Sequence, residues 1–274
     1  MNDGINIILN PYVNGKFYIG RFANILTFIL YNIYKYLVVN DYKHINIYII
    51  DDINSYNLGY INYGFLFKEE YVSFYNIHIK SEEEFNKIKD NYILNEFRFN
   101  KDADYKNEFL SYNYENFIKP EYYLNEKYNI IHIRLKDYLS ENYKKIGYRT
   151  IPNREYIDNI LNYLNIDESD CVLISDDIKT AKRIYKLENI KTLIYSSGKE
   201  RLRKDFITLI NSKNLIGSCS TFSIIGGLLG KNNKIFLQYP YLSIDENDEH
   251  NRNLDFLYNN DKVIKLDEFG NIIN

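Results

Sequence analysis

The sequence of 274 residues contains no tryptophan, only two cysteines and only four prolines. Two cysteines cannot build a disulfide framework or a cysteine-rich zinc site. An excess of basic residues is also missing, because 34 Lys and Arg stand against 37 Asp and Glu. Non-specific nucleic-acid binding depends on such an excess, so we expect no nucleic-acid partner.

A long, uninterrupted hydrophobic run is absent as well. The most apolar helical stretch covers residues 22–39, and Asn24, Thr27, Asn32 and Lys35 interrupt it. A bilayer span needs roughly 20 predominantly apolar residues, so this stretch predicts a buried amphipathic helix and no transmembrane segment. Residues 1–20 lack the basic start and apolar core of a secretory signal, which favours a cytoplasmic protein.

What the chain does contain is an ordinary globular mixture, with 45% hydrophobic and 26% charged residues. Its 29 tyrosines and 16 phenylalanines accompany abundant Asn, Ile and Lys, which is typical of an AT-rich genome. Many tyrosines therefore occupy positions where other proteins have Leu or Phe, and the aromatic content by itself indicates no function.

The second half of the chain alternates short apolar runs with helical segments. Strands are predicted at residues 129–134, 171–175, 192–195, 215–217 and 235–238, and helices at 153–164, 177–187, 200–212 and 221–230. This alternation is typical of βαβ units and a parallel sheet. Ligands of such sheets bind at the carboxyl ends of the strands, so residues that follow each strand are the first candidates.

The first half is less regular. Strands are predicted at residues 5–9 and 44–50, with a helix at 21–39 between them. Ser81 and Glu84 form a capping-box pattern that predicts a helix to about residue 90. Residues 53–80 and 98–127 show no clear period. We predict a Rossmann-like domain over 1–125, a second over 126–245, and a tail at 246–274 that could pack back on the first.

Charged residues follow the predicted strand at 129–134. Alternation puts His132 and Arg134 on one face, and an Arg at the open end of a parallel strand can hold an anionic group with two hydrogen bonds. The alternative is a surface salt bridge from Arg134 or Lys136 to Asp137.

Asp176 and Asp177 follow the next strand. One of them, or Ser175, is expected to cap the helix that starts near residue 178. A cap needs a single side chain, so the other carboxylate is a candidate for ligand contact.

Small hydroxyl residues then precede an apolar helix, in the run Ser218-Cys219-Ser220-Thr221-Phe222-Ser223. Free N–H groups and hydroxyls at a helix start can bind an anion, although Ser220 could also be an ordinary cap. Gly226 and Gly227 in this helix indicate close packing or close approach to a ligand. Neither a Gly-rich dinucleotide fingerprint nor a phosphate-loop motif is present in the sequence.

Taken in order, these motifs resemble the α-1,2-fucosyltransferases of glycosyltransferase family 11, and more distantly the protein O-fucosyltransferases and α-1,6-fucosyltransferases. The segment Gly20-Arg21-Phe22-Ala23-Asn24 also looks like the segment that opens the first helix of the family. The resemblance covers most of residues 5–240 and is densest at 129–238. The sequence departs from the family pattern at a second Arg, a Gln and two Trp, whose places are taken by Leu135, Ile25, Ile224 and Ile225.

The resemblance implies an α/β fold of the GT-B type, in which two Rossmann-like domains with mostly parallel sheets face a cleft. It implies an inverting, metal-independent transfer of fucose from GDP-fucose to a glycan hydroxyl, with formation of an α-1,2 linkage. The implied catalytic residues are Arg134, Asp137 and Asn24, and the implied donor-binding residues are His132, Arg134, Asp176, Asp177, Asp205, Ser220, Thr221 and Phe222. Arg134 would hold the β-phosphate, Asp205 would contact guanine, and Asn24 would reach toward the fucose from the first domain.

An acceptor hydroxyl must lose a proton during such a transfer. Asp137 is the first candidate for the general base, Glu141 the second, and Asp176 or Asp177 the third. Asp102-Ala103-Asp104 matches the spelling of a metal-binding Asp-x-Asp, but no apolar strand precedes it. We therefore expect no metal and no cofactor, with GDP-fucose as donor substrate and a glycan as acceptor.

Two other functions remain open from the sequence. The donor could be another nucleotide-linked deoxysugar, or the chain could be an inactive module of the same fold that binds a glycan or a nucleotide. Leu135 in place of the second Arg keeps both alternatives open, whereas Arg134, Asp205 and the hydroxyl run favour an active enzyme.

Overall fold

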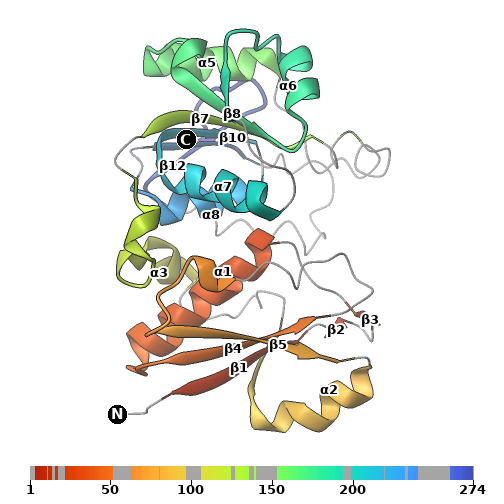
Figure 1. Ribbon diagram of the computed structural model, residues 1–274. Helices are drawn as coiled ribbons and strands as arrows, with labels where there is room; N and C mark the ends of the chain where they lie inside the picture. The colour runs from red at the N-terminus through yellow and green to blue at the C-terminus, as the bar shows by residue number, and fades with distance from the viewer. Residues whose placement is uncertain are drawn as a thin grey trace. The chain divides into compact units, whose positions relative to one another are not determined.

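The computed structural model describes residues 4–10, 12–13, 16–17, 22–51, 63–79, 81–96, 106–124, 127–135, 139, 153–193, 199–218, 220–231, 234–239 and 260–273. The chain divides into two compact units, Met1–Tyr122 and Tyr123–Asn274, which are called unit 1 and unit 2 below. The division lies close to the boundary that the sequence predicted after residue 125. Each unit is built around a parallel sheet (Figure 1).

The described part of unit 1 contains a four-stranded parallel sheet in the order β5-β4-β1-β6. Its strands are β1 (Ile5–Asn10), β4 (Ile45–Asp51), β5 (Val72–His78) and β6 (Ile93–Glu96). Counted along the chain this order is 3-2-1-4, the order of the first half of a Rossmann sheet. Helices α1 (Phe22–Asn32) and α2 (Glu82–Ile88) lie on opposite faces of the sheet (Figure 1).

Shorter elements complete the described part of unit 1. They are the hairpin strands β2 (Tyr12–Val13) and β3 (Lys16–Phe17), the π-helix η1 (Ile33–Val39), the 3₁₀ turns η3 (Tyr63–Phe65), η4 (Lys89–Asn91), η5 (Tyr114–Asn116) and η6 (Pro120–Tyr122), and helix α3 (Lys106–Ser111). Residues 53–62 and 97–105 lie outside the described residues.

The burial of helix α1 is not confined to one face, as it would be in the predicted amphipathic helix. Its side chains from Ile25 to Leu30 are all buried, and so is Ile33 at the start of η1. The polar Thr27 and Asn32 are satisfied within the helix, because each donates a hydrogen bond of 2.7 Å to the carbonyl four residues earlier. In the part of the chain that the structure describes, no helix is long and apolar enough to cross a membrane.

The capping signal before α2 is confirmed. Ser81 is the N-cap, and its hydroxyl accepts a hydrogen bond of 3.2 Å from the backbone N–H of Glu84. Phe85 then packs against Ile8 and Ile50 of the sheet, so one turn after its cap the helix is anchored by apolar contact.

The described part of unit 2 contains a six-stranded parallel sheet in the order β12-β11-β10-β7-β8-β9. Its strands are β7 (Tyr128–Ile133), β8 (Cys171–Ser175), β9 (Lys191–Thr192), β10 (Ser212–Gly217), β11 (Lys234–Gln238) and β12 (Val263–Leu266). Counted along the chain the order is 6-5-4-1-2-3, which is the complete Rossmann order. The predicted strands of this half are therefore confirmed, although β9 is shorter and begins one residue before its prediction.

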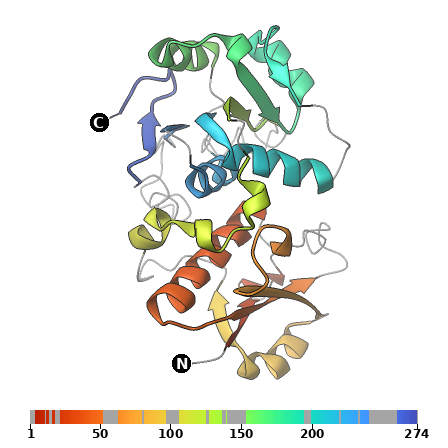
Figure 2. The same cartoon turned by 60° about the vertical axis from the view of Figure 1, so that its left-hand side comes forward.

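Helices cover both faces of this sheet. The helices α5 (Arg154–Leu164) and α6 (Ile178–Tyr185) lie on one face, and α7 (Lys199–Ile210) and α8 (Thr221–Leu229) lie on the other (Figures 1 and 2). A short 3₁₀ turn, η7 (Glu168–Asp170), precedes β8. The strands β7 and β8 are buried on both faces, which explains why they read as continuous apolar runs.

The described part of the tail predicted at 246–274 belongs to the sheet of unit 2. Residues Val263–Leu266 form β12, which pairs in parallel with β11 and extends the sheet of unit 2. A turn at Asp267–Asn271 then returns the chain, and the N–H of Ile273 donates to Lys265 at 2.9 Å. The backbone of this segment is thus hydrogen-bonded inside unit 2.

Candidate functional site

The site lies where the strand order of unit 2 reverses. Strands β7 and β10 are neighbours, and the chain runs outward from them in opposite directions across the sheet. A doubly wound sheet leaves a crevice outside the carboxyl ends of its strands at this point. Arg134 directly follows β7, and Ser218 and Ser220 follow β10.

Hydrogen bonds join the two strand ends. The N–H of Ser218 donates to the carbonyl of His132 at 3.0 Å, and the N–H of Arg134 donates to the Ser218 hydroxyl at 3.2 Å. Arg134 is half-buried at this position. Its backbone is therefore fixed at the carboxyl end of β7 by a partner 84 residues away in the sequence.

His132 is buried beneath the site. Its Nδ1 lies 2.5 Å from the Ser223 hydroxyl of α8, and its ring centroid lies 5.5 Å from that of Phe222. Burial lowers the pKa of His132 to about 4, against an opposing effect of the Asp176 charge. The ring is therefore neutral at pH 7, and it supports the first turn of α8 from inside the unit.

The two adjacent aspartates have different contacts. Asp177 is the N-cap of α6 and accepts a hydrogen bond of 3.0 Å from the N–H of Thr180. Asp176 accepts one of 2.8 Å from the N–H of Leu135 and thereby holds the chain that leaves β7. Leu135, which replaces the second Arg of the family pattern, is fully buried in the apolar core of unit 2.

The start of α8 contains an unsatisfied polar group. Ser220 is the N-cap residue, yet its side chain makes no capping hydrogen bond. The residue is 3% exposed, and its hydroxyl oxygen has no hydrogen-bond partner among the described residues. A buried hydroxyl without a partner costs about 1–3 kcal/mol. A ligand oxygen at the helix start would remove this cost.

Asp205 lies on α7 with its side chain 15% exposed. Burial raises its pKa to about 6, although the nearby Arg201 guanidinium lowers it. The Nε of Arg201 lies 3.5 Å from the Asp205 carboxylate, and Arg201 also donates to the carbonyl of Ser175 at the end of β8. Arg201 thus pairs with Asp205 within α7, and its hydrogen bond to Ser175 joins this helix to the carboxyl edge of the sheet.

Some predicted residues lie outside what the structure describes. Asp137, Glu141, Asp102 and Asp104 are not among the described residues, and of Asn24 only its place in α1 is described. The roles of Asp137 and Asn24 therefore remain predictions. The structure does bring Arg134, Ser220, Thr221 and Asp176 to one edge of the sheet, because each follows a strand that ends there.

Sequence reasoning did not assign roles to three residues of the site. Ser218 anchors Arg134, Ser223 contacts His132, and Arg201 pairs with Asp205. Only the last pair had a usable signal, because an Arg four residues before an Asp on a helix predicts an ion pair. The other two contacts depend on the neighbourhood of β7 and β10.

Gly217 is required for the packing of α8, and Gly217→Ala is expected to destabilise unit 2 by about 1–3 kcal/mol, the usual cost of overpacking. An added Cβ would lie 2.8 Å from Leu237 Cδ2 and 2.9 Å from Ser223 Cβ, so the contact between Ser223 and His132 would shift. Urea unfolding measures the change. The control is Gly4→Ala, whose Cβ would meet its nearest neighbour at 3.7 Å and should be nearly neutral. Equal stability of both variants would contradict this packing role.

A complete Rossmann strand order with an arginine and a helix start at its switch point is the arrangement of a Rossmann-like glycosyltransferase domain. The family model for glycosyl transferase family 11 matches residues 124–259, about half of the chain and most of unit 2. Unit 2 therefore belongs to glycosyl transferase family 11, the family of α-1,2-fucosyltransferases. The resemblance that the sequence motifs indicated is confirmed over this segment. A search of curated proteins finds no match to the chain.

Proposed function

We propose that the protein is an inverting, metal-independent fucosyltransferase that moves fucose from GDP-fucose to a glycan hydroxyl and forms an α-1,2 linkage. Its membership of family 11 supports the reaction class. Its donor would bind at the carboxyl edge of the unit 2 sheet, and unit 1 would contribute Asn24 in a GT-B arrangement.

The observation that carries the proposal is the buried hydroxyl of Ser220 at the start of α8, for which the described residues offer no hydrogen-bond partner. Free backbone N–H groups and the helix dipole at the same place favour an anion. A diphosphate oxygen bound there would accept a hydrogen bond from Ser220 and from the first N–H groups of α8. Arg134, fixed at the next strand end, would supply the positive charge.

The reaction assigns a separate task to each group. The acceptor oxygen attacks C1 of fucose, the bond from C1 to the phosphate oxygen breaks, and GDP leaves with the electron pair. Negative charge grows on the diphosphate in the transition state, and Arg134 with the α8 start would stabilise it. Asp137 would take the proton of the acceptor hydroxyl.

Asp205 would provide the contact to guanine. A carboxylate can accept hydrogen bonds from the N1–H and N2–H₂ groups of guanine, and uracil does not offer this pair of donors. The partly buried ion pair with Arg201 would hold the carboxylate in place.

Calorimetric titration with GDP, GDP-fucose and UDP tests the donor and the metal together. We expect GDP and GDP-fucose to bind equally well with and without EDTA, because the proposed phosphate site consists of N–H groups, hydroxyls and Arg134. UDP should bind more weakly. Loss of GDP binding in EDTA would overturn the metal-free mechanism, and equal affinity for UDP would favour a different nucleotide sugar.

A further inference from the structure

Unit 1 contains a cavity of about 400 Å³ that the proposed reaction does not use. Three segments far apart in the sequence form its walls: the end of η1 with the turn before β4, the segment before β5, and the 3₁₀ turn η5 with the residue after it. Ligand pockets typically enclose about 300–1,000 Å³, so this cavity is large enough for a small ligand.

Backbone hydrogen bonds hold the three walls together. The N–H of Lys68 donates to the carbonyl of Phe117 at 2.9 Å, and the N–H of Lys119 donates to that of Leu66 at 3.0 Å. The N–H of Ile45 donates to the carbonyl of Tyr71 at 2.9 Å and joins the other two walls. The cavity is therefore formed before any ligand binds, which reduces the entropic cost of binding.

The side chains around the cavity combine three kinds of chemistry. Lys43 and Lys68 supply positive charge, Asp41 and Asn116 supply hydrogen-bonding oxygens, and Tyr71 supplies an aromatic wall. The Lys68 ammonium lies 5.9 Å from the centre of the Tyr71 ring, and that ring packs edge-to-face on Phe117 with centroids 5.1 Å apart. Charge and aromatic surface thus occur side by side in one cavity.

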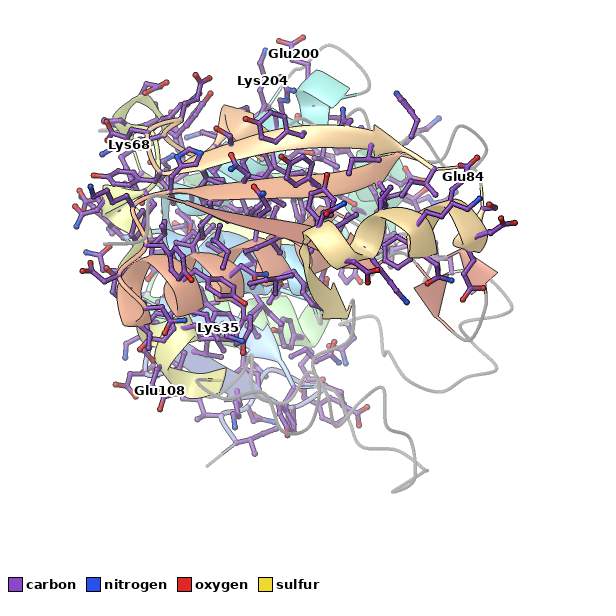
Figure 3. The ribbon with its side chains drawn as sticks, turned by 90° about the horizontal axis from the view of Figure 1, so that it is seen from below. Lys35, Lys68, Glu84, Glu108, Glu200 and Lys204 are labelled. Carbon is purple, nitrogen blue, oxygen red and sulfur yellow. The ribbon has the colours of Figure 1, made fainter. Side chains whose placement is uncertain are left out.

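The cavity lies at the end of the sheet opposite to the strand ends that bind ligands in this fold. Its residues precede β4 and β5, so they stand at the amino ends of these parallel strands. In Figure 3, Lys68 is near the tails of the strand arrows, whereas Glu84 of α2 is beyond their heads. A seven-residue strand spans roughly 20 Å, which separates the cavity from the carboxyl edge of this sheet.

We propose that this cavity is a second carbohydrate-binding site, for a sugar unit that carries a carboxylate. The sugar carboxylate pairs with Lys43 and Lys68, its hydroxyls bond to Asp41 and Asn116, and the apolar face of the ring packs against Tyr71. Asp41 favours a sugar over a compact anion. A phosphate or sulfate has only acceptor oxygens to offer near the Asp41 carboxylate, whereas a sugar can place its carboxylate at the lysines and its hydroxyls, which donate hydrogen bonds, at Asp41.

The test uses a hyaluronan tetrasaccharide, which contains glucuronate, and the same tetrasaccharide after reduction of its carboxyls to alcohols. Ligand-observed NMR titrations without nucleotide are independent of the donor, so their outcome is separate from that of the GDP titrations. We expect the acidic form to bind the wild type at least about tenfold more tightly than the reduced form, because hydrogen bonds to charged groups are strong.

Variants locate the binding. Lys43→Gln/Lys68→Gln should remove the preference for the acidic form, whereas Lys35→Gln should keep it. Lys35 is a matched control, since it lies in unit 1 at 5.3 Å from the Tyr36 ring but does not line the cavity (Figure 3). Tyr71→Leu should lower the affinity for both forms of the tetrasaccharide severalfold. The melting temperature of each variant verifies that it is folded.

Three results would overturn the proposal. The first is no binding of the acidic tetrasaccharide to the wild type. The second is binding that the double lysine variant leaves unchanged, even if the Tyr71 variant does not fold. The third is displacement of the tetrasaccharide by inorganic phosphate at an equal concentration, which would make the cavity a site for simple anions.

Discussion

Arg134→Ala should lower the rate of GDP release from GDP-fucose by about 10²–10³, the range for removal of one preorganised group that stabilises charge in a transition state. The rate can be followed with water or a glycan as acceptor, because the same leaving group departs in both reactions. The fold should be unaffected, since the Ser218 hydroxyl accepts its hydrogen bond from the backbone N–H of residue 134, which alanine retains.

Two further variants separate charge from geometry in this experiment. Arg134→Lys keeps the positive charge but cannot form a two-point contact with phosphate, so its rate should lie between those of the wild type and the alanine variant. Arg183→Ala removes an exposed arginine of α6 from the same unit and should leave the rate unchanged. An Arg134→Ala enzyme within a few-fold of wild type would exclude Arg134 from the phosphate site.

Asp205→Ala should lower the affinity for GDP by about 10–150-fold, which corresponds to the 1.5–3 kcal/mol of a hydrogen bond to a charged group. UDP affinity should change little, because the proposed contact is to guanine alone. Titration of both nucleotides against the variant measures the difference. Equal weakening of GDP and UDP would indicate that Asp205 stabilises α7 through Arg201 and does not recognise the base.

The pH dependence of GDP binding provides an independent test of Asp205. With a pKa of about 6, only about one tenth of this carboxyl is ionised at pH 5, so GDP should bind several-fold more weakly there than at pH 7. UDP carries the same diphosphate and corrects for phosphate titration. Arg201→Gln removes the cation that lowers this pKa, so the midpoint of the GDP curve should move to higher pH.

The effect on folding has the opposite sign. Burial raises the folded-state pKa of Asp205 above its usual value of 3.8, so the protonated carboxyl favours the folded state at low pH. This contribution is lost as the pH rises through about 6. If GDP affinity rises from pH 5 to pH 7 while the free energy of unfolding does not, the effect of Asp205 on GDP binding is separated from its effect on folding.

Much of unit 2 could be predicted from the sequence because its central strands are buried on both faces. The runs at β7, β8, β10 and β11 are short, apolar and separated by helices with recognisable starts. The start of a helix could also be predicted where the side chain of the N-cap residue accepts a hydrogen bond from the first turn, as those of Ser81 and Asp177 do. Such signals are local, so one sequence is sufficient to detect them.

Three strands of the two parallel sheets were not predicted, and all three lie at the edges of their sheets. These are β5, β6 and β12. Edge strands are often short and polar because they need not bury both faces, so their period is weak. In β5, for example, only Val72 is buried, whereas Tyr75 and Asn76 are exposed.

The sequence by itself determined the α/β class, the parallel sheet of unit 2, and the order of the strand-end residues Arg134, Asp176 and Ser220. Only the tertiary structure decided what these residues contact: that Asp177 caps while Asp176 holds Leu135, that Ser223 meets His132, and that the Ser220 hydroxyl has no hydrogen-bond partner among the described residues. The physical reason is the strand order. Strands β8 and β9 lie on one side of β7, and β10 lies on the other. Contacts at the switch point therefore join residues 84 and 91 positions apart, and no local pattern encodes them.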